Sequence, residues 1–197
     1  MRRAILVRHG ESEYSAVGRL NGDVEVAVGL TARGREEARR LGGQLAGEQL
    51  DLCVTSAFRR TRETADEALR GREVPRLVLP ELNDPLYGPY EGAQVEDYRA
   101  WAATSASGVS PEPGGESRLA LVVRYARGLR LLLTRPEATL LVVCHSLPVS
   151  YALAAREGRA PAVRMPFAGH AVPYPFSAAE LEAAAAILEG WAANPTW

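Results

Sequence analysis

The sequence contains no lysine: all 23 of its basic residues are arginines. This absence excludes several classes of enzyme. A phosphate-loop nucleotide hydrolase needs the lysine of its glycine-rich loop, a protein kinase needs a lysine on a strand, and Schiff-base and pyridoxal enzymes need a primary amine. The gap accompanies heavy use of alanine and glycine, which indicates codon bias as its cause.

Excess charge, long apolar runs and cysteine are scarce as well. A formal net charge of −1 provides no overall field to attract nucleic acid or an anionic membrane. No uninterrupted apolar stretch approaches the roughly 20 residues that a membrane span needs, and no signal-peptide pattern follows Met1. The two cysteines, Cys53 and Cys144, lie inside apolar runs, as reduced thiols in a core do. We therefore expect a cytoplasmic protein without nucleic-acid or membrane partners.

The apolar pattern indicates an α/β fold. The length of 197 residues suits one domain, predicted over residues 1–197. Helical patterns separate short buried runs, which favours a three-layer domain with a mainly parallel central sheet and helices on both faces. Residues 91–115 form a possible cap, and residues 161–175 are expected to be irregular. The strands are predicted at 4–7, 50–54, 76–79 and 138–144, and the helices at 31–41, 60–69, 117–133 and 177–193.

The residues that follow each predicted strand indicate where the chemistry lies. In parallel α/β sheets, ligands bind beyond the carboxyl ends of the strands. Two histidines, several arginines and acidic residues are therefore expected to converge on one edge. These residues are Arg8 to Ser12 after the first strand, Thr55 to Arg60 after the second, Glu81 to Asp84 after the third, and His145 and Ser146 after the fourth.

Arginine beside histidine is the pairing expected where a phosphoryl group is held and attacked. A guanidinium fork matches two phosphate oxygens and stays charged at physiological pH. A neutral imidazole attacks phosphorus when its other nitrogen is held by a hydrogen bond. A second histidine would stabilise the equatorial oxygens, and a carboxylic acid would protonate the leaving alkoxide.

Ordered sequence blocks carry a family resemblance over about three-quarters of the chain. Leu6-Val7-Arg8-His9-Gly10-Glu11-Ser12 resembles the signature of the histidine phosphatase superfamily, which includes the phosphoglycerate mutases. The resemblance implies a phosphoglycerate mutase-like fold. Further blocks follow in the family order: Leu30-Thr31 with Gly34, residues 55–65, Tyr87-Gly88 with Glu91-Gly92, residues 113–117, and Val142 to His145.

The resemblance implies a nucleophile at His9, which would form a phosphohistidine intermediate. Arg8, Arg60 and His145 would complete the phosphate pocket. Aligning the second block on Thr64-Ala65 places the family arginine at Arg60 rather than at its neighbour.

The family pattern also indicates an acid and two further binding residues. It places the general acid at Asp84, where the family usually has Glu, and Glu81 in the same loop is the alternative. Ser15 stands where many members carry a phosphate-binding Asn, and its hydroxyl is able to donate one hydrogen bond. Arg19 lies in a loop that could reach the substrate. His170 lies outside every block and is expected to be structural.

The sequence therefore predicts a metal-independent phosphomonoester hydrolase without a cofactor, acting on a small phosphorylated substrate. Phosphoglycerate mutase-type transfer and a catalytically weak phosphate-binding domain remain alternatives. A cysteine phosphatase loop from Cys53 to Arg59 is disfavoured, because Cys53 lies inside a strand and the loop has no glycine. No histidine pair has metal-ligand spacing. The oligomeric state stays open.

Overall fold

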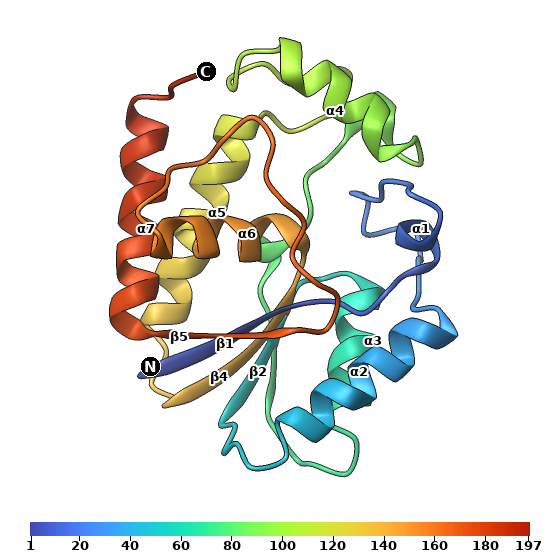
Figure 1. The fold of residues 1–197 in the computed structure, drawn as a ribbon, viewed down its shortest axis with the longest axis vertical. Helices are drawn as coiled ribbons and strands as arrows, with labels where there is room; N and C mark the ends of the chain where they lie inside the picture. The colour runs from blue at the N-terminus through green and yellow to red at the C-terminus, as the bar shows by residue number, and fades with distance from the viewer.

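Five strands form one sheet in the order β3-β2-β4-β1-β5. Figure 1 labels β2, β4, β1 and β5. The computed structural model describes all 197 residues. Neighbouring strands are parallel, except that β5 runs antiparallel to β1. The strands are β1 (Arg3–Arg8), β2 (Leu52–Thr55), β3 (Arg76–Val78), β4 (Thr139–Cys144) and β5 (Pro173–Ser177).

Helices cover both faces of the sheet. The helices α5, α6 and α7 pack on one face, and α2 and α3 pack on the other (Figure 1). They are α1 (Glu13–Ala16), α2 (Ala32–Gln44), α3 (Arg59–Ala68), α4 (Val95–Thr104), α5 (Arg118–Leu133), α6 (Ser146–Arg156) and α7 (Ala178–Ala193). Two short 3-10 helices, Pro80–Leu82 and Gly88–Tyr90, lie between β3 and α4.

The alternation of side chains along β1 explains the three layers. Ala4 and Leu6 belong to the apolar cluster under α5, α6 and α7, whereas Ile5 and Val7 belong to the cluster under α2 and α3. Because successive strand residues point to opposite faces, a continuous apolar run fills both cores. The predicted α/β class and the sandwiched, mainly parallel sheet are confirmed.

Hydroxyl side chains mark where several helices begin. Thr31, Ser117 and Ser177 each accept a hydrogen bond from a backbone N–H in the first turn of the following helix. Such N-caps satisfy donors that the helix itself leaves free. The predicted helices match α2, α3, α5 and α7 to within a few residues.

The expectation for residues 161–175 was only partly right, because β5 begins at Pro173. This strand carries Pro173 and Pro175, and proline usually argues against a strand. It is tolerated here because β5 lies at the edge of the sheet and pairs only with β1. The helices α4 and α6 were also not predicted. No helix combines the length and the apolarity that crossing a membrane requires.

Candidate active site

His9 follows β1 directly and is 4% exposed. Its Nδ1 lies 2.7 Å from the carbonyl oxygen of Gly10, which accepts only, so Nδ1 carries the proton. Its Nε2 accepts a hydrogen bond from Arg60 Nε at 3.2 Å. Burial, with Arg60 as the next cause, lowers the pKa of His9 well below its ordinary value. His9 is thus a neutral imidazole with its lone pair on Nε2.

Gly10 allows the loop after β1 to lie against α2. A Cβ on Gly10 would stand 2.4 Å from the carbonyl oxygen of Gly34, and a Cβ on Gly34 would stand 2.0 Å from that of Glu11. Both distances are far inside van der Waals contact. The two glycines therefore fix the position of His9 relative to the sheet.

Arg60 lies at the centre of the site and is 3% exposed. It donates from Nη2 to Asp84 Oδ2 at 2.7 Å and to the carbonyl oxygen of Asn21 at 3.0 Å. Its guanidinium lies 4.1 Å from the centroid of the Phe58 ring. Arg59, by contrast, pairs with Glu63 at the surface. The structure therefore brings Arg60, and not Arg59, to the histidines.

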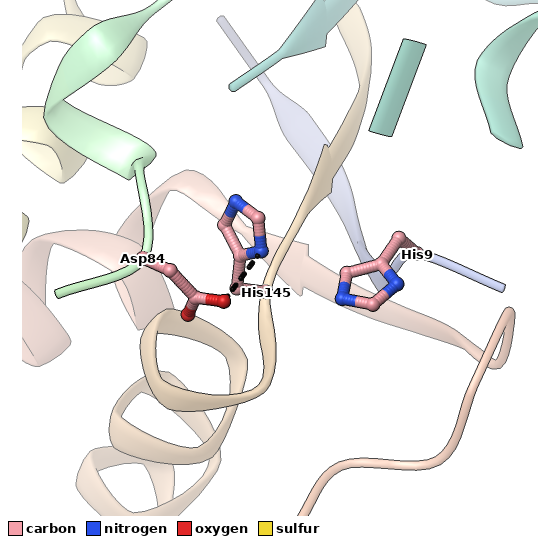
Figure 2. Close-up of side chains that lie close together, drawn as sticks. All are labelled: His9, Asp84 and His145. Atoms are coloured by element: carbon pink, nitrogen blue, oxygen red, sulfur yellow. Dashed lines mark ion pairs between the residues drawn. The ribbon is translucent and has the colours of Figure 1, made fainter. Parts of the chain in front are cut away.

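Asp84 and His145 form a close pair opposite His9. Figure 2 shows the Asp84 carboxylate directed at the His145 ring, with His9 on the other side of that ring. His145 Nδ1 lies 3.1 Å from Asp84 Oδ2, and Ser56 Oγ lies 2.8 Å from His145 Nε2. His145 therefore donates to Asp84 and accepts from Ser56.

The pKa values of this pair move in the same direction. Burial lowers the pKa of His145 to about 4, despite the opposing effect of Asp84. Burial acts to raise the pKa of Asp84, but His145 and Arg60 outweigh it and hold that pKa at about 2. At neutral pH the pair is thus a carboxylate and a neutral imidazole.

The loop that carries Asp84 is held by side chains from α5. Arg124 donates to the carbonyl oxygens of Asn83 at 2.9 Å and Asp84 at 3.3 Å, and it pairs with Glu116 at 2.7 Å. Tyr125 donates to the carbonyl oxygen of Asn83 at 3.0 Å. Arg124 therefore holds the Asp84 loop in place.

Glu81, the alternative acid, points away from the histidines. Its carboxylate lies 3.5 Å from Arg127 Nε, and it does not line the cavity. The structure favours Asp84 over Glu81.

Arg8 and His170 are further neighbours of His9. Arg8 donates to the carbonyl oxygen of Ala168 at 2.9 Å, its buried Nε has no hydrogen-bond partner, and burial lowers its pKa to about 10. His170 Nδ1 lies 2.8 Å from the carbonyl oxygen of His9, and the two rings are 5.6 Å apart. The sequence reasoning missed His170 as a neighbour of the site, because no motif surrounds it.

Ser15 and Arg19 both line the cavity, with different environments. Ser15 caps α1 together with Ser12: its Oγ accepts from the Ser12 N–H at 2.8 Å. Arg19 is exposed, and its side chain makes no hydrogen bond or ion pair within the protein. Neither touches His9, so a contact with substrate remains a prediction for both.

One cavity of about 620 Å³ is lined by Arg8, His9, Ser15, Arg19, Arg60, Asp84 and His170. His145 is fully buried and does not line it, but it contacts Asp84, which does. Tyr14 and Tyr87 line the cavity, whereas Tyr90 packs on Tyr98 and Trp101. The volume suits a small organic ligand. Its main charged, imidazole and phenol side chains are Arg8, His9, Tyr14, Arg19, Arg60, Asp84, Tyr87, Glu96, Tyr98, Arg99, Arg118, Arg164 and His170.

One set of possible metal ligands lies in the site. His9, Asp84 and His145 each offer an atom within 4.8 Å of the others. The guanidinium of Arg60 already touches all three, at 3.2 Å from His9 Nε2, 2.7 Å from Asp84 Oδ2 and 3.3 Å from His145 Nδ1. A dication would have to displace this buried cation, so the residues suit an anion better than a metal.

Neither cysteine belongs to the cavity. Cys53 and Cys144 are fully buried in the two cores. Burial raises the pKa of Cys53 to about 11 and that of Cys144 to about 12. Such thiols are poor nucleophiles, so the geometry does not support a cysteine phosphatase.

Comparison with known proteins shows relatives over most of the chain. An adenosylcobalamin/alpha-ribazole phosphatase of Salmonella typhimurium is 32% identical over 161 residues, covering 77% of this chain and 78% of its own. Phosphoserine phosphatase 1 of Hydrogenobacter thermophilus is 30% identical over 164 residues, 76% and 73% of the two chains. A 2,3-bisphosphoglycerate-dependent phosphoglycerate mutase of Brucella melitensis is 32% identical over 175 residues, 81% and 84%.

Solved structures and a family model agree with these relatives. The alpha-ribazole phosphatase of Shigella flexneri superposes with a TM-score of 0.70 at 26% identity, over 88% of this chain and 89% of its own. The model of the histidine phosphatase superfamily (branch 1) matches residues 4–171. The chain therefore belongs to the histidine phosphatase superfamily, branch 1.

Proposed function

We propose that the protein hydrolyses small phosphomonoesters through a phosphohistidine on His9, with Asp84 as general acid. One observation carries the proposal above the others. The hydrogen bond to Gly10 keeps the proton of His9 on Nδ1 and so places the lone pair on Nε2, which attacks once the phosphoryl oxygens take the hydrogen bond of Arg60. Arginines on both sides, Arg8 and Arg60, suit the oxygens of a phosphoryl group.

The first half-reaction uses the contacts described above. His9 Nε2 forms a bond to phosphorus, and the bond from phosphorus to the leaving oxygen breaks. The phosphoryl oxygens take over the hydrogen bond that Arg60 donates to Nε2 in the free site. Asp84 donates its proton to the leaving oxygen, which departs as an alcohol.

The proton on Asp84 has to come with the substrate. In the free site the pKa of Asp84 is about 2, because Arg60 and His145 favour the carboxylate. A bound phosphate ester adds negative charge beside Asp84 and draws on the same guanidinium, and both effects raise this pKa. A phosphomonoester that binds with its own proton then supplies the proton for the leaving group.

Water completes the reaction in the proposed scheme. The Asp84 carboxylate takes a proton from water, the hydroxide oxygen bonds to phosphorus, and the bond to His9 Nε2 breaks. Water is favoured over a sugar-phosphate acceptor, because the chain is short and has only residues 91–115 to shape the space above the site. Of this segment, Gln94, Val95, Glu96, Tyr98 and Arg99 line the cavity, which supports its role as a cap.

The substrate class and the setting are proposed on similar grounds. The phosphatases among the relatives are named for small phosphorylated molecules, and the cavity has the matching size. Cys53 and Cys144 are free thiols, which fits the reducing cytoplasm.

Turnover of p-nitrophenyl phosphate by the wild type and His9→Ala tests the proposal. We expect hydrolysis by the wild type, loss of at least a thousandfold in His9→Ala, and no effect of EDTA. Retained turnover in His9→Ala, or loss with EDTA, would contradict the mechanism. A wild type that is inactive from pH 4 to 8 across a substrate panel would favour the phosphate-binding alternative. Transfer of the phosphoryl group to phosphoglycerate in preference to water would favour the mutase.

A further inference from the structure

We propose that Arg118 binds a second anionic group of the substrate, a carboxylate or a second phosphate, in the same cavity. The inference rests on the proposed function, since it concerns the part of the substrate that the phosphate pocket does not hold. It concerns a residue that makes no contact with His9, Arg60 or Asp84.

Arg118 is a buried cation without a carboxylate partner. It is 8% exposed, and it donates only to two phenol oxygens, from Nε to Tyr98 at 3.3 Å and from Nη1 to Tyr151 at 3.4 Å. Arg60 and Arg124 differ, because they pair with Asp84 and Glu116. Arg8 also has no carboxylate partner, but it adjoins His9 and belongs to the phosphate pocket. A buried charge without a counter-ion is costly to the fold.

The position of Arg118 in its helix adds to this cost. It is the first residue of α5, a helix of 16 residues. The amino end of a helix carries partial positive charge and favours an anion, so a cation there is unfavourable. A bound anion would relieve both the missing counter-ion and the unfavourable helix end.

Arg118 reaches the cavity that holds the catalytic side chains. No protein group accepts from its Nη2, and the Tyr98 hydroxyl, which also lines the cavity, donates to no protein group. Together they present donors and a positive charge to a ligand. This donor set suits oxygen anions and offers nothing to an amine or a cation.

Tyr87 connects this place to the phosphate pocket. Its ring packs edge-on against Tyr98 with centroids 5.0 Å apart. Tyr87 and Tyr98 line the same cavity as Asp84 and Arg118. One small substrate is therefore able to span both positions.

The charge of the cavity lining also exceeds what a single phosphate needs. Six arginines and two carboxylates line the cavity. Arg99 and Arg164 share the carboxylate of Glu96 near the surface, at 2.9 and 3.4 Å. Arg118 has no such neutralising contact, which makes it the site for the second anion.

Matched pairs of substrates test the proposal. Each of 2-, 3- and 4-carboxyphenyl phosphate is compared with the corresponding primary carboxamide, which keeps the number of heavy atoms in the ring substituent and removes the charge. The phenylene bisphosphates form a second arm that distinguishes a phosphate from a carboxylate. In the wild type we expect kcat/KM for the best charged member to exceed that for its uncharged partner by about tenfold or more. A ratio near one in every pair overturns the proposal.

Variants identify the residue responsible. Arg118→Gln is expected to reduce the ratio to within about twofold of one. Arg130→Gln removes an exposed arginine from the same helix, which pairs with Glu182 and Glu189, and it is expected to keep the wild-type ratio. An unchanged ratio in Arg118→Gln overturns the proposal. If Arg118→Gln fails to fold, Arg118→Lys replaces it. Lysine keeps the positive charge but loses the two-pronged guanidinium, so the ratio should fall part of the way toward one. An unchanged ratio in Arg118→Lys also overturns the proposal.

Binding to an inactive protein separates this inference from the proposed function. Titration calorimetry on His9→Ala measures the affinity for the same substrate pairs without turnover. We expect the charged member to bind about tenfold more tightly. Equal affinities overturn the second subsite even if the wild type is an active phosphatase. Unequal affinities in a protein that proves inactive support the subsite while the proposed function fails.

Discussion

Replacing Asp84 with Asn separates its chemical role from its structural role. Asn keeps the size of the side chain and an oxygen that accepts from Arg60, but it has no proton to give to a leaving group. A general acid contributes about 10²- to 10⁴-fold to a rate. We therefore expect the rate of phosphohistidine formation from an alkyl phosphate, measured in a single turnover, to fall by that factor. The same rate for p-nitrophenyl phosphate should fall much less, because its leaving group departs as a stable anion.

The structural part of the effect follows from the pKa of Asp84. The fall from an ordinary 3.8 to about 2 corresponds to about 2 kcal/mol of stability. Because the folded-state pKa is depressed, this stability is present above about pH 4 and is lost as the pH falls through 2. Urea unfolding at pH 7 should therefore show Asp84→Asn less stable by about 2 kcal/mol, with the difference disappearing near pH 2.

The matched control is Glu81→Gln. Glu81 lies in the same loop and pairs with Arg127 near the surface. We expect both activities and the unfolding free energy to stay within about twofold and 0.5 kcal/mol of the wild type. The reasoning is refuted if Glu81→Gln loses the alkyl phosphatase activity, or if Asp84→Asn slows phosphohistidine formation from both substrates by the same factor.

Three further predictions concern other parts of the site. Burial lowers the pKa of His145 from 6.5 to about 4. The free energy of unfolding of the wild type should therefore be highest above pH 6.5 and fall by about 3 kcal/mol as the pH drops to 4. Urea unfolding at a series of pH values should show a smaller fall for His145→Gln. Arg124→Met frees the Asp84 loop and should lower kcat for an alkyl phosphate by about 10- to 100-fold while KM changes little. Equal loss in the rate of phosphohistidine formation from alkyl and nitrophenyl substrates would argue against positioning of the acid. Gly10→Ala places a Cβ against Gly34 and should cost at least about 2 kcal/mol in urea unfolding together with most activity, whereas the matched change Gly43→Ala, with open space around it, should not destabilise the protein.

The core of the site could be predicted because its residues lie at strand ends within short motifs. His9 follows β1 and His145 follows β4, and the parallel register of these two strands places Arg8 beside Cys144. The register choice of Arg60 over Arg59 and the choice of Asp84 over Glu81 both agree with where the structure places these side chains. Both choices were made by aligning on one nearby motif of the family, and their roles stay predictions.

Other features depend on long-range contacts that no local pattern reveals. The strand β5 carries two prolines and exists because β1 offers it an edge. His170 reaches the site through a hydrogen bond to His9, 161 positions away. Arg118 resembles any helix-start arginine in the sequence, and only the fold shows that it lacks a carboxylate. Asn21, which accepts from Arg60, lies in a loop without a sequence signal.

Trapping the covalent intermediate tests the central claim most directly. The wild type is mixed for milliseconds with a substrate labelled with ³²P in its phosphoryl group, quenched in denaturant, digested and mapped. We expect a label that is labile in acid and stable in base on the peptide that contains His9, and no label in His9→Ala. A label on a different residue, or rapid wild-type turnover without any label on His9, would contradict the account.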